Sequence, residues 1–160
     1  MENIDHEQVV ESKVSNKKGN KLSVKFKKYK FQSQPIIIGN SAMHFYKLKQ
    51  TSSSDAIEMI ISSDDFKGLL ENNINLQMQK TMLGNHIVEN NNIYYLNYYY
   101  FDYSTILEKA IKYKTKLYIN KEHLIMFHTM SAFNKRDKIN RNVIKSHLES
   151  IQLLVNSLLI

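Results

Sequence analysis

The stretch from Ile93 to Met130 constrains the fold of this chain more than any other. It contains three runs of β-branched and aromatic residues separated by short breaks, a composition typical of strands in a packed sheet. In the middle run, Ile111 to Ile119, apolar residues alternate with polar ones, the period of a half-buried strand. The polar face comprises Lys112, Lys114, Lys116 and Tyr118. We expect an antiparallel meander onto which helices from either side in the sequence pack.

Shorter alternating runs predict further strands before this stretch, at residues 22–34, 43–50 and 56–61. The link at residues 104–110 fits either one helical turn or a continued strand with a bulge.

A helix is expected at about residues 64–83. Ser62 precedes Asp65 by three residues, the spacing of a capping box. An apolar stripe follows, and Gly84 supplies a stop signal. A cluster of asparagines at residues 72–75 has low helix propensity and makes a break there an alternative.

A second helix is expected at residues 141–158, the best-patterned segment of the chain. Its apolar residues are spaced 4, 3, 4 and 3 apart, which gives one apolar stripe on a helix. They are Ile144, Leu148, Ile151, Val155 and Leu158. The stripe is short for a coiled coil, so we expect the helix to dock on the sheet.

Together these segments predict a single α+β domain over residues 21–160. We expect a twisted antiparallel sheet flanked by helices in a three-layer α/β/α sandwich. Residues 1–20 are polar and lack a hydrophobic period, so we expect a flexible N-terminal arm.

Composition narrows the classes of protein further. The 160 residues suit one domain, and the net charge of +7 is compatible with an acidic partner, nucleic acid or an anionic membrane. The absence of cysteine excludes disulfides and thiolate sites. The first residues lack a signal-peptide core, and no run reaches the ~18 apolar residues of a membrane span. We expect a cytoplasmic protein, or an exported one if a leader precedes this numbering.

The sequence contains no pattern of catalytic residues. His123 and His128 are predicted on opposite faces of one strand, where they do not share a metal. The convergence of His44, His86 and His147 cannot be judged from sequence. The scattered glycines form no phosphate-binding loop. We therefore expect a protein that is not an enzyme and has no cofactor and no metal.

The tyrosines and lysines of the central stretch are the candidate binding residues. Tyrosine is common at interfaces because its ring is large and its tip is polar. The predicted partner-binding residues are Tyr94, Tyr98, Tyr100, Lys112, Lys114, Lys116 and Tyr118. In the alternative interpretation, helices cover both faces of the sheet and the tyrosines belong to the core.

The order of elements and the C-terminal sequence ESIQLLVNSLL, from Glu149 to Leu159, resemble the PsbP-like superfamily. The resemblance covers about Leu22 to Leu159 and is one of pattern, so no site residue is transferred from it. It implies a three-layer sandwich of helices around an antiparallel sheet. Members include photosystem accessory subunits, a Ran-binding release factor, bacterial envelope proteins and chaperones of type VI secretion effectors. Most bind partners rather than catalyse reactions.

The leading hypothesis is therefore a non-catalytic adaptor, chaperone or immunity-type protein, associated through the resemblance with bacterial secretion. Its partner would be another protein of acidic character, with a homodimer left open. The first alternative is a nucleic-acid binder that uses Lys112, Lys114, Lys116 and nearby rings. The second is an enzyme whose site converges only in three dimensions.

Overall fold

The computed structural model describes residues 10–15, 21–26, 28–133 and 140–160. Its centre is a seven-stranded sheet in the order β10-β11-β3-β4-β7-β6-β5. The strands are β3 (Ile36–Ile37), β4 (Ile57–Ile60), β5 (Gln79–Lys80), β6 (Asn85–Glu89), β7 (Asn92–Tyr95), β10 (Ile111–Tyr113) and β11 (Lys116–Tyr118). The helices are α1 (Gly39–Phe45), α2 (Ser63–Asn72), α3 (Tyr103–Leu107), α4 (Lys121–Phe133) and α5 (Arg141–Leu158).

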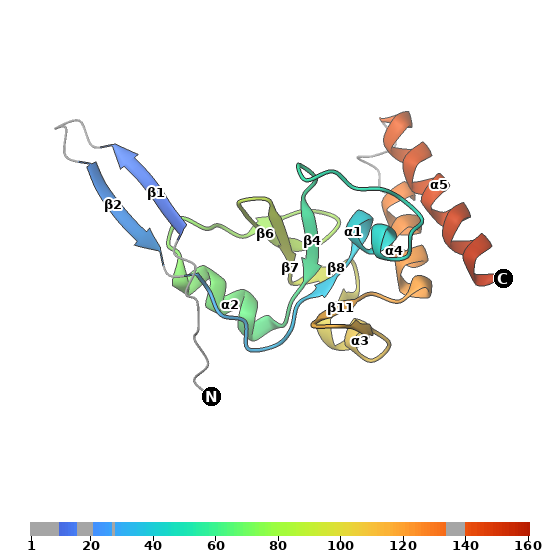
Figure 1. Ribbon diagram of the computed structural model, residues 1–160, viewed down its shortest axis with the longest axis horizontal. Helices are drawn as coiled ribbons and strands as arrows, with labels where there is room; N and C mark the ends of the chain where they lie inside the picture. The colour runs from blue at the N-terminus through green and yellow to red at the C-terminus, as the bar shows by residue number, and fades with distance from the viewer. Residues whose placement is uncertain (1–9, 16–20, 27, 134–139) are drawn as a thin grey trace.

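Helices cover both faces of this sheet, and the predicted α+β class is confirmed. Figure 1 shows α2 on one side of the sheet and α1, α4 and α5 on the other. The side chains of β4 and β7 alternate accordingly: Met59 and Tyr94 pack with α2, whereas Ile60 and Tyr95 belong to the larger core on the other face.

The sheet is mixed, which corrects the expectation of a purely antiparallel sheet. Four pairings are antiparallel, but β3 runs parallel to β11 and β4 runs parallel to β7. A parallel pair needs a crossover connection, and the segment containing α2 provides it between β4 and β7. Strands of either orientation share the period of two, so the sequence pattern does not distinguish them.

The stretch Ile111–Ile119 is extended as predicted, but it forms a hairpin rather than one strand. Lys114 has a positive φ of 53° at the turn, and β10 then pairs antiparallel with β11. The stretch before it is also divided, since β7 is followed by the short pair β8 (Asn97–Tyr98) and β9 (Phe101–Asp102). The link at residues 104–110 begins with the helix α3, whose N-cap side chain is that of Asp102.

The third predicted strand of the central stretch is wrong, because residues 121–133 form α4. The Asn120 side chain accepts a hydrogen bond from the His123 amide at 2.8 Å and begins the helix. α4 is apolar on more than one side because it lies between the sheet and α5. It therefore lacks the single stripe by which an amphipathic helix is recognised.

Two further expectations are corrected at α1 and α2. Residues 43–50, predicted as a strand, contain the end of α1. α2 begins at the predicted cap, where Ser62 Oγ accepts from the Asp65 amide at 3.2 Å, but it ends at Asn72 rather than near residue 83. The break therefore falls at the asparagine cluster.

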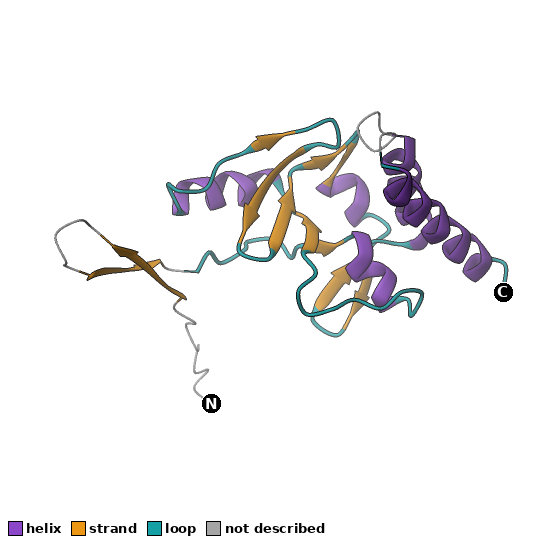
Figure 2. Cartoon of the chain, turned by 90° about the horizontal axis from the view of Figure 1, so that it is seen from above, coloured by secondary structure: helices purple, strands orange, loops and turns teal. Residues whose placement is uncertain are grey.

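α5 has the predicted bounds, Arg141–Leu158. It packs on α4 rather than directly on the sheet, and Figure 2 shows the two helices side by side. Leu154 of α5 is fully buried in the larger core. α5 thus adds an outer layer to this side of the molecule.

The N-terminal region contains β1 (Val10–Ser15) and β2 (Lys21–Phe26), which pair as a separate two-stranded sheet. The predicted arm at residues 1–20 therefore includes a strand, and the remainder of that arm lies outside the described residues. The mobility of this region stays a prediction.

Asp65 fixes the segment before β3 against α2. Its side chain is fully buried and accepts hydrogen bonds from Tyr29 Oη (2.9 Å), the Gln32 amide (2.7 Å), the Ser33 amide (2.9 Å) and Ser62 Oγ (2.8 Å). Burial acts to raise the pKa of Asp65, but the hydrogen bonds outweigh it and leave the pKa below its ordinary value.

We expect Asp65→Asn to lower the free energy of unfolding by about 3 kcal/mol, because buried donors lose a charged acceptor. Urea unfolding followed by circular dichroism measures this loss. Asp64→Asn is the matched control, since Asp64 is exposed and lies in the first turn of the same helix.

The stabilising effect of Asp65 also depends on pH. A carboxyl group with a lowered pKa stabilises the fold above its unfolded-state pKa and loses that effect as pH falls. Asp65→Asn should therefore flatten the loss of stability below about pH 4; equal effects of the two substitutions would contradict this role.

Candidate binding groove

Two of the predicted interface tyrosines belong to the core, which corrects the expectation of an exposed tyrosine face. Tyr94 and Tyr98 are 5% and 7% exposed. Tyr98 stacks on Phe127 with ring centroids 4.4 Å apart and hydrogen-bonds Ser131 through its hydroxyl. Tyr100 is 95% exposed. The rings of Tyr94 and Tyr98 are buried because helices cover both faces of the sheet.

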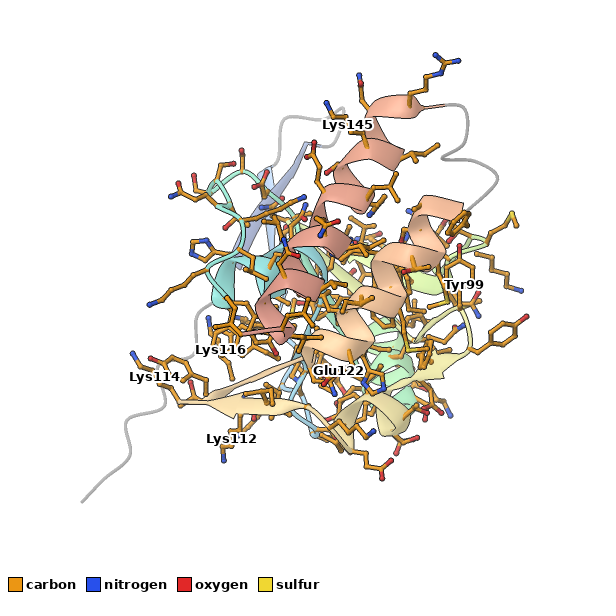
Figure 3. All side chains as sticks on the ribbon, turned by 90° about the vertical axis from the view of Figure 1, so that its right-hand side faces the viewer. Tyr99, Lys112, Lys114, Lys116, Glu122 and Lys145 are labelled. Atoms are coloured by element: carbon orange, nitrogen blue, oxygen red, sulfur yellow. The ribbon has the colours of Figure 1, made fainter. Side chains whose placement is uncertain are left out.

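The three predicted lysines are exposed but do not share one face. Cross-strand partners in a hairpin lie on the same face, so Lys112 lies with Leu117, whereas Lys116 lies with Tyr113 on the other face. Figure 3 shows Lys112 and Lys116 on opposite sides of the hairpin, with Lys114 at its tip. The figure also places Tyr99, the neighbour of Tyr100 in sequence, far from these lysines. The predicted joint surface of tyrosines and lysines is therefore not formed.

The hairpin instead forms a groove with the end of α1. Phe45 stacks on Tyr118 at a centroid distance of 3.9 Å and lies 5.5 Å from the ring of Tyr113. These rings and the segment 44–50 border an open groove with a volume of about 790 Å³. We call this the basic-aromatic groove; its lining is His44, Phe45, Lys47, Leu48, Lys49, Gln50, Tyr113 and Tyr118.

The backbone at the end of α1 directs the chain along this groove. Lys47 has a φ of 59°, its amide bonds the His44 carbonyl at 2.9 Å, and the Leu48 amide bonds the Met43 carbonyl at 3.0 Å. This is a Schellman motif with lysine at the position that usually holds glycine. Tyr46 Oη donates to the Ile119 carbonyl at 2.7 Å and fastens the same turn to the end of β11.

The charge around the groove is positive. Lys47 is exposed, Lys116 shares the face of Tyr113, and Lys114 Nζ lies 5.5 Å from the Tyr113 ring centroid. Lys49 is held in place, because its Nζ donates to the Ser146 carbonyl at 3.2 Å, and burial lowers its pKa. Among the residues that the structure describes, no acidic side chain lines the groove. It is therefore suited to a ligand that carries negative charge and apolar groups.

The histidines are arranged differently from the prediction. His123 and His128 lie on α4, not on a strand, and His128 meets His147 of α5 with their Nδ1 atoms 3.0 Å apart. Within residues 28–133 and 140–160, no three His, Asp or Glu side chains are grouped so that they could hold a metal ion. The His128–His147 contact belongs to a separate pocket between the helices.

No family model, curated protein or solved structure matches this chain. None of the helices in the described ranges has the length and apolar character needed to cross a membrane. The resemblance to the PsbP-like superfamily stays a prediction, and the groove is interpreted from its own geometry.

The predicted site residues do not include Phe45, Lys47 or Tyr113. Lys114-Thr115 lacks the Gly, Asn or Asp that marks a hairpin turn, so the alternating pattern places Tyr113 on an apolar face. α1 is only seven residues long, too short for a helical period to stand out. No signal in the sequence places Phe45 beside Tyr118.

A double-mutant cycle on Phe45 and Tyr118 tests the stacked pair. We expect Phe45→Leu and Tyr118→Leu to show a coupling of about 1 kcal/mol in the free energy of unfolding, the usual value for contacting aromatic rings. The control cycle combines Phe45→Leu with Tyr100→Leu, because Tyr100 is exposed and does not line the groove. A coupling near zero in the first cycle, equal to that of the control, would show that the rings do not stack in solution.

Proposed function

We propose that this protein is a non-catalytic binding protein that holds an acidic segment of another protein in the basic-aromatic groove. The observation that carries the proposal is the contact of Phe45 with Tyr113 and Tyr118 inside a groove edged by lysines. Aromatic rings provide apolar contact area at little entropic cost, and the lysines favour carboxylates.

An acidic protein segment fits this groove better than single-stranded nucleic acid. Nucleic-acid platforms need ring faces that are free to stack on successive bases. Here Phe45 and Tyr118 occupy one another's faces, with an interplanar angle of 11°, and both are half-buried. The Tyr113 ring is 52% exposed, but Lys114 Nζ lies over it. The side chains of a bound peptide, in contrast, can contact the ring edges and the tyrosine hydroxyl groups of the groove that remain accessible.

The exposed strand β10 supports the same interpretation. β10 is the edge of the seven-stranded sheet, so its outward backbone groups are available to a further strand. An extended peptide added there would run beside Tyr113 and Lys114. An adaptor, chaperone or immunity-type role, as the PsbP-like resemblance implies, is compatible with such a mode of binding.

Affinity capture from cells that produce the protein naturally, with nuclease treatment, tests the proposal. We expect Lys116→Glu to reduce capture of a protein partner at least fivefold because it reverses a charge on the groove face. Lys112→Glu is a closely matched control, since it makes the same change in the same hairpin on the opposite face. We expect it to leave capture nearly unchanged.

The salt dependence of binding distinguishes the two kinds of partner. Phosphate contacts make affinity fall steeply with salt, whereas an aromatic protein interface responds less. Retention of nucleic acid alone, removed by nuclease and by moderate salt, would contradict the proposal. Equal loss of a protein partner in both lysine variants would also contradict it, because the groove face would then have no special role.

A further inference from the structure

A second pocket lies between the helices and the sheet. The basic-aromatic groove is at the end of α1, whereas this pocket is at the start of that helix. It has a volume of about 240 Å³ and is lined by the start of α1, by Glu58 of β4, and by residues of α4 and α5. A cavity of about 150 Å³ is enough to bind benzene. This pocket therefore has room for a molecule of the size of a substituted benzene.

Glu58 supplies a carboxyl group to this pocket. Its Oε1 accepts a hydrogen bond from Tyr95 Oη at 3.4 Å, and no lysine or arginine in the described ranges forms a salt bridge with it. Burial raises the pKa of Glu58, an effect that the Tyr95 hydrogen bond opposes. A carboxylate that leaves water is costly unless a positive charge compensates it.

The backbone makes room for this carboxyl group. Gly39 begins α1 with a φ of +62°, and a Cβ at this position would collide with Glu58 Oε2. A larger residue at position 39 would displace the Glu58 side chain, and the positive φ itself favours glycine there.

His128 and Ser131 are further polar groups of the pocket. His128 is 5% exposed, and burial, followed by the neighbouring His147 and Lys49, lowers its pKa to about 3. Its Nδ1 faces His147 Nδ1 at 3.0 Å, and its buried Nε2 has no hydrogen-bond partner among the described residues. Ser131 Oγ hydrogen-bonds Tyr98 Oη. His128, with its lowered pKa, and Ser131 are uncharged at pH 7, so they can hydrogen-bond a ligand but do not neutralise Glu58.

We propose that this pocket binds a small organic ammonium ion, with its nitrogen at Glu58 and its apolar part against Leu124, Phe127 and Val143. The ammonium ion supplies a positive charge beside Glu58, and the three apolar side chains contact its hydrocarbon part. An anion would face the Glu58 carboxyl group, and among the described residues no lysine or arginine lines the pocket to hold it. A neutral molecule would favour the protonated form of Glu58, whereas an ammonium ion favours its carboxylate form.

Benzylammonium, benzyl alcohol and benzoate form a matched set of probes that differ in charge and little in shape. We expect isothermal titration of the full chain at pH 7 to give an affinity for benzylammonium at least tenfold above that for the other two. Glu58→Gln should remove this preference, whereas Glu108→Gln, which changes an exposed carboxyl group outside the pocket, should retain it.

Val143→Phe fills the pocket and tests where the ligand binds. We expect it to weaken benzylammonium at least tenfold, with folding checked by circular dichroism. Undiminished affinity for benzylammonium in Val143→Phe would overturn the proposal, and so would a retained preference for the amine in Glu58→Gln. In the unmodified protein, equal affinity for benzyl alcohol, tighter binding of benzoate or no binding of the amine would also overturn it. If Val143→Phe does not fold, the comparison of Glu58→Gln with Glu108→Gln is sufficient to test whether the amine binds at Glu58.

Discussion

The parallel pairing of β3 with β11 determines how the rest of the structure is assembled. Ile36 and Ile37 pair with Leu117 and Tyr118, and the Ile119 amide extends the ladder to the Ile37 carbonyl at 3.0 Å. Since α1 begins two residues after β3, this pairing brings the β10–β11 hairpin beside α1. Without it, Phe45 and Tyr118 would belong to unconnected parts of the molecule.

α1 connects the two proposed binding sites. Its first residue, Gly39, lines the pocket at Glu58, and its last residue, Phe45, lines the basic-aromatic groove. Between them, Ala42 and Met43 are fully buried in the larger core. The two sites also differ in charge, because the groove presents lysines and the pocket presents a carboxyl group. The two proposals therefore place ligands of opposite charge at the two ends of the same short helix.

The sequence predicted those elements whose pattern results from one-sided burial. α5 was located because one face packs on α4 and the other meets water, and the cap of α2 was located because Ser62 and Asp65 carry its hydrogen bonds. α4 was missed because it is covered on more than one side, so its apolar residues have no helical period. The groove and the pocket depend on pairings between distant segments, such as His128 with His147, which local patterns do not encode.

Chemical-shift mapping on the isotope-labelled full chain tests most directly whether the basic-aromatic groove binds an acidic segment. With an unstructured glutamate-rich peptide, we expect the largest amide shifts in residues 44–50 and 111–118. Lys116→Glu should reduce these shifts, and Lys112→Glu should not. Shifts centred on α2 or on the face of Lys112, or no shifts at millimolar peptide, would contradict the account.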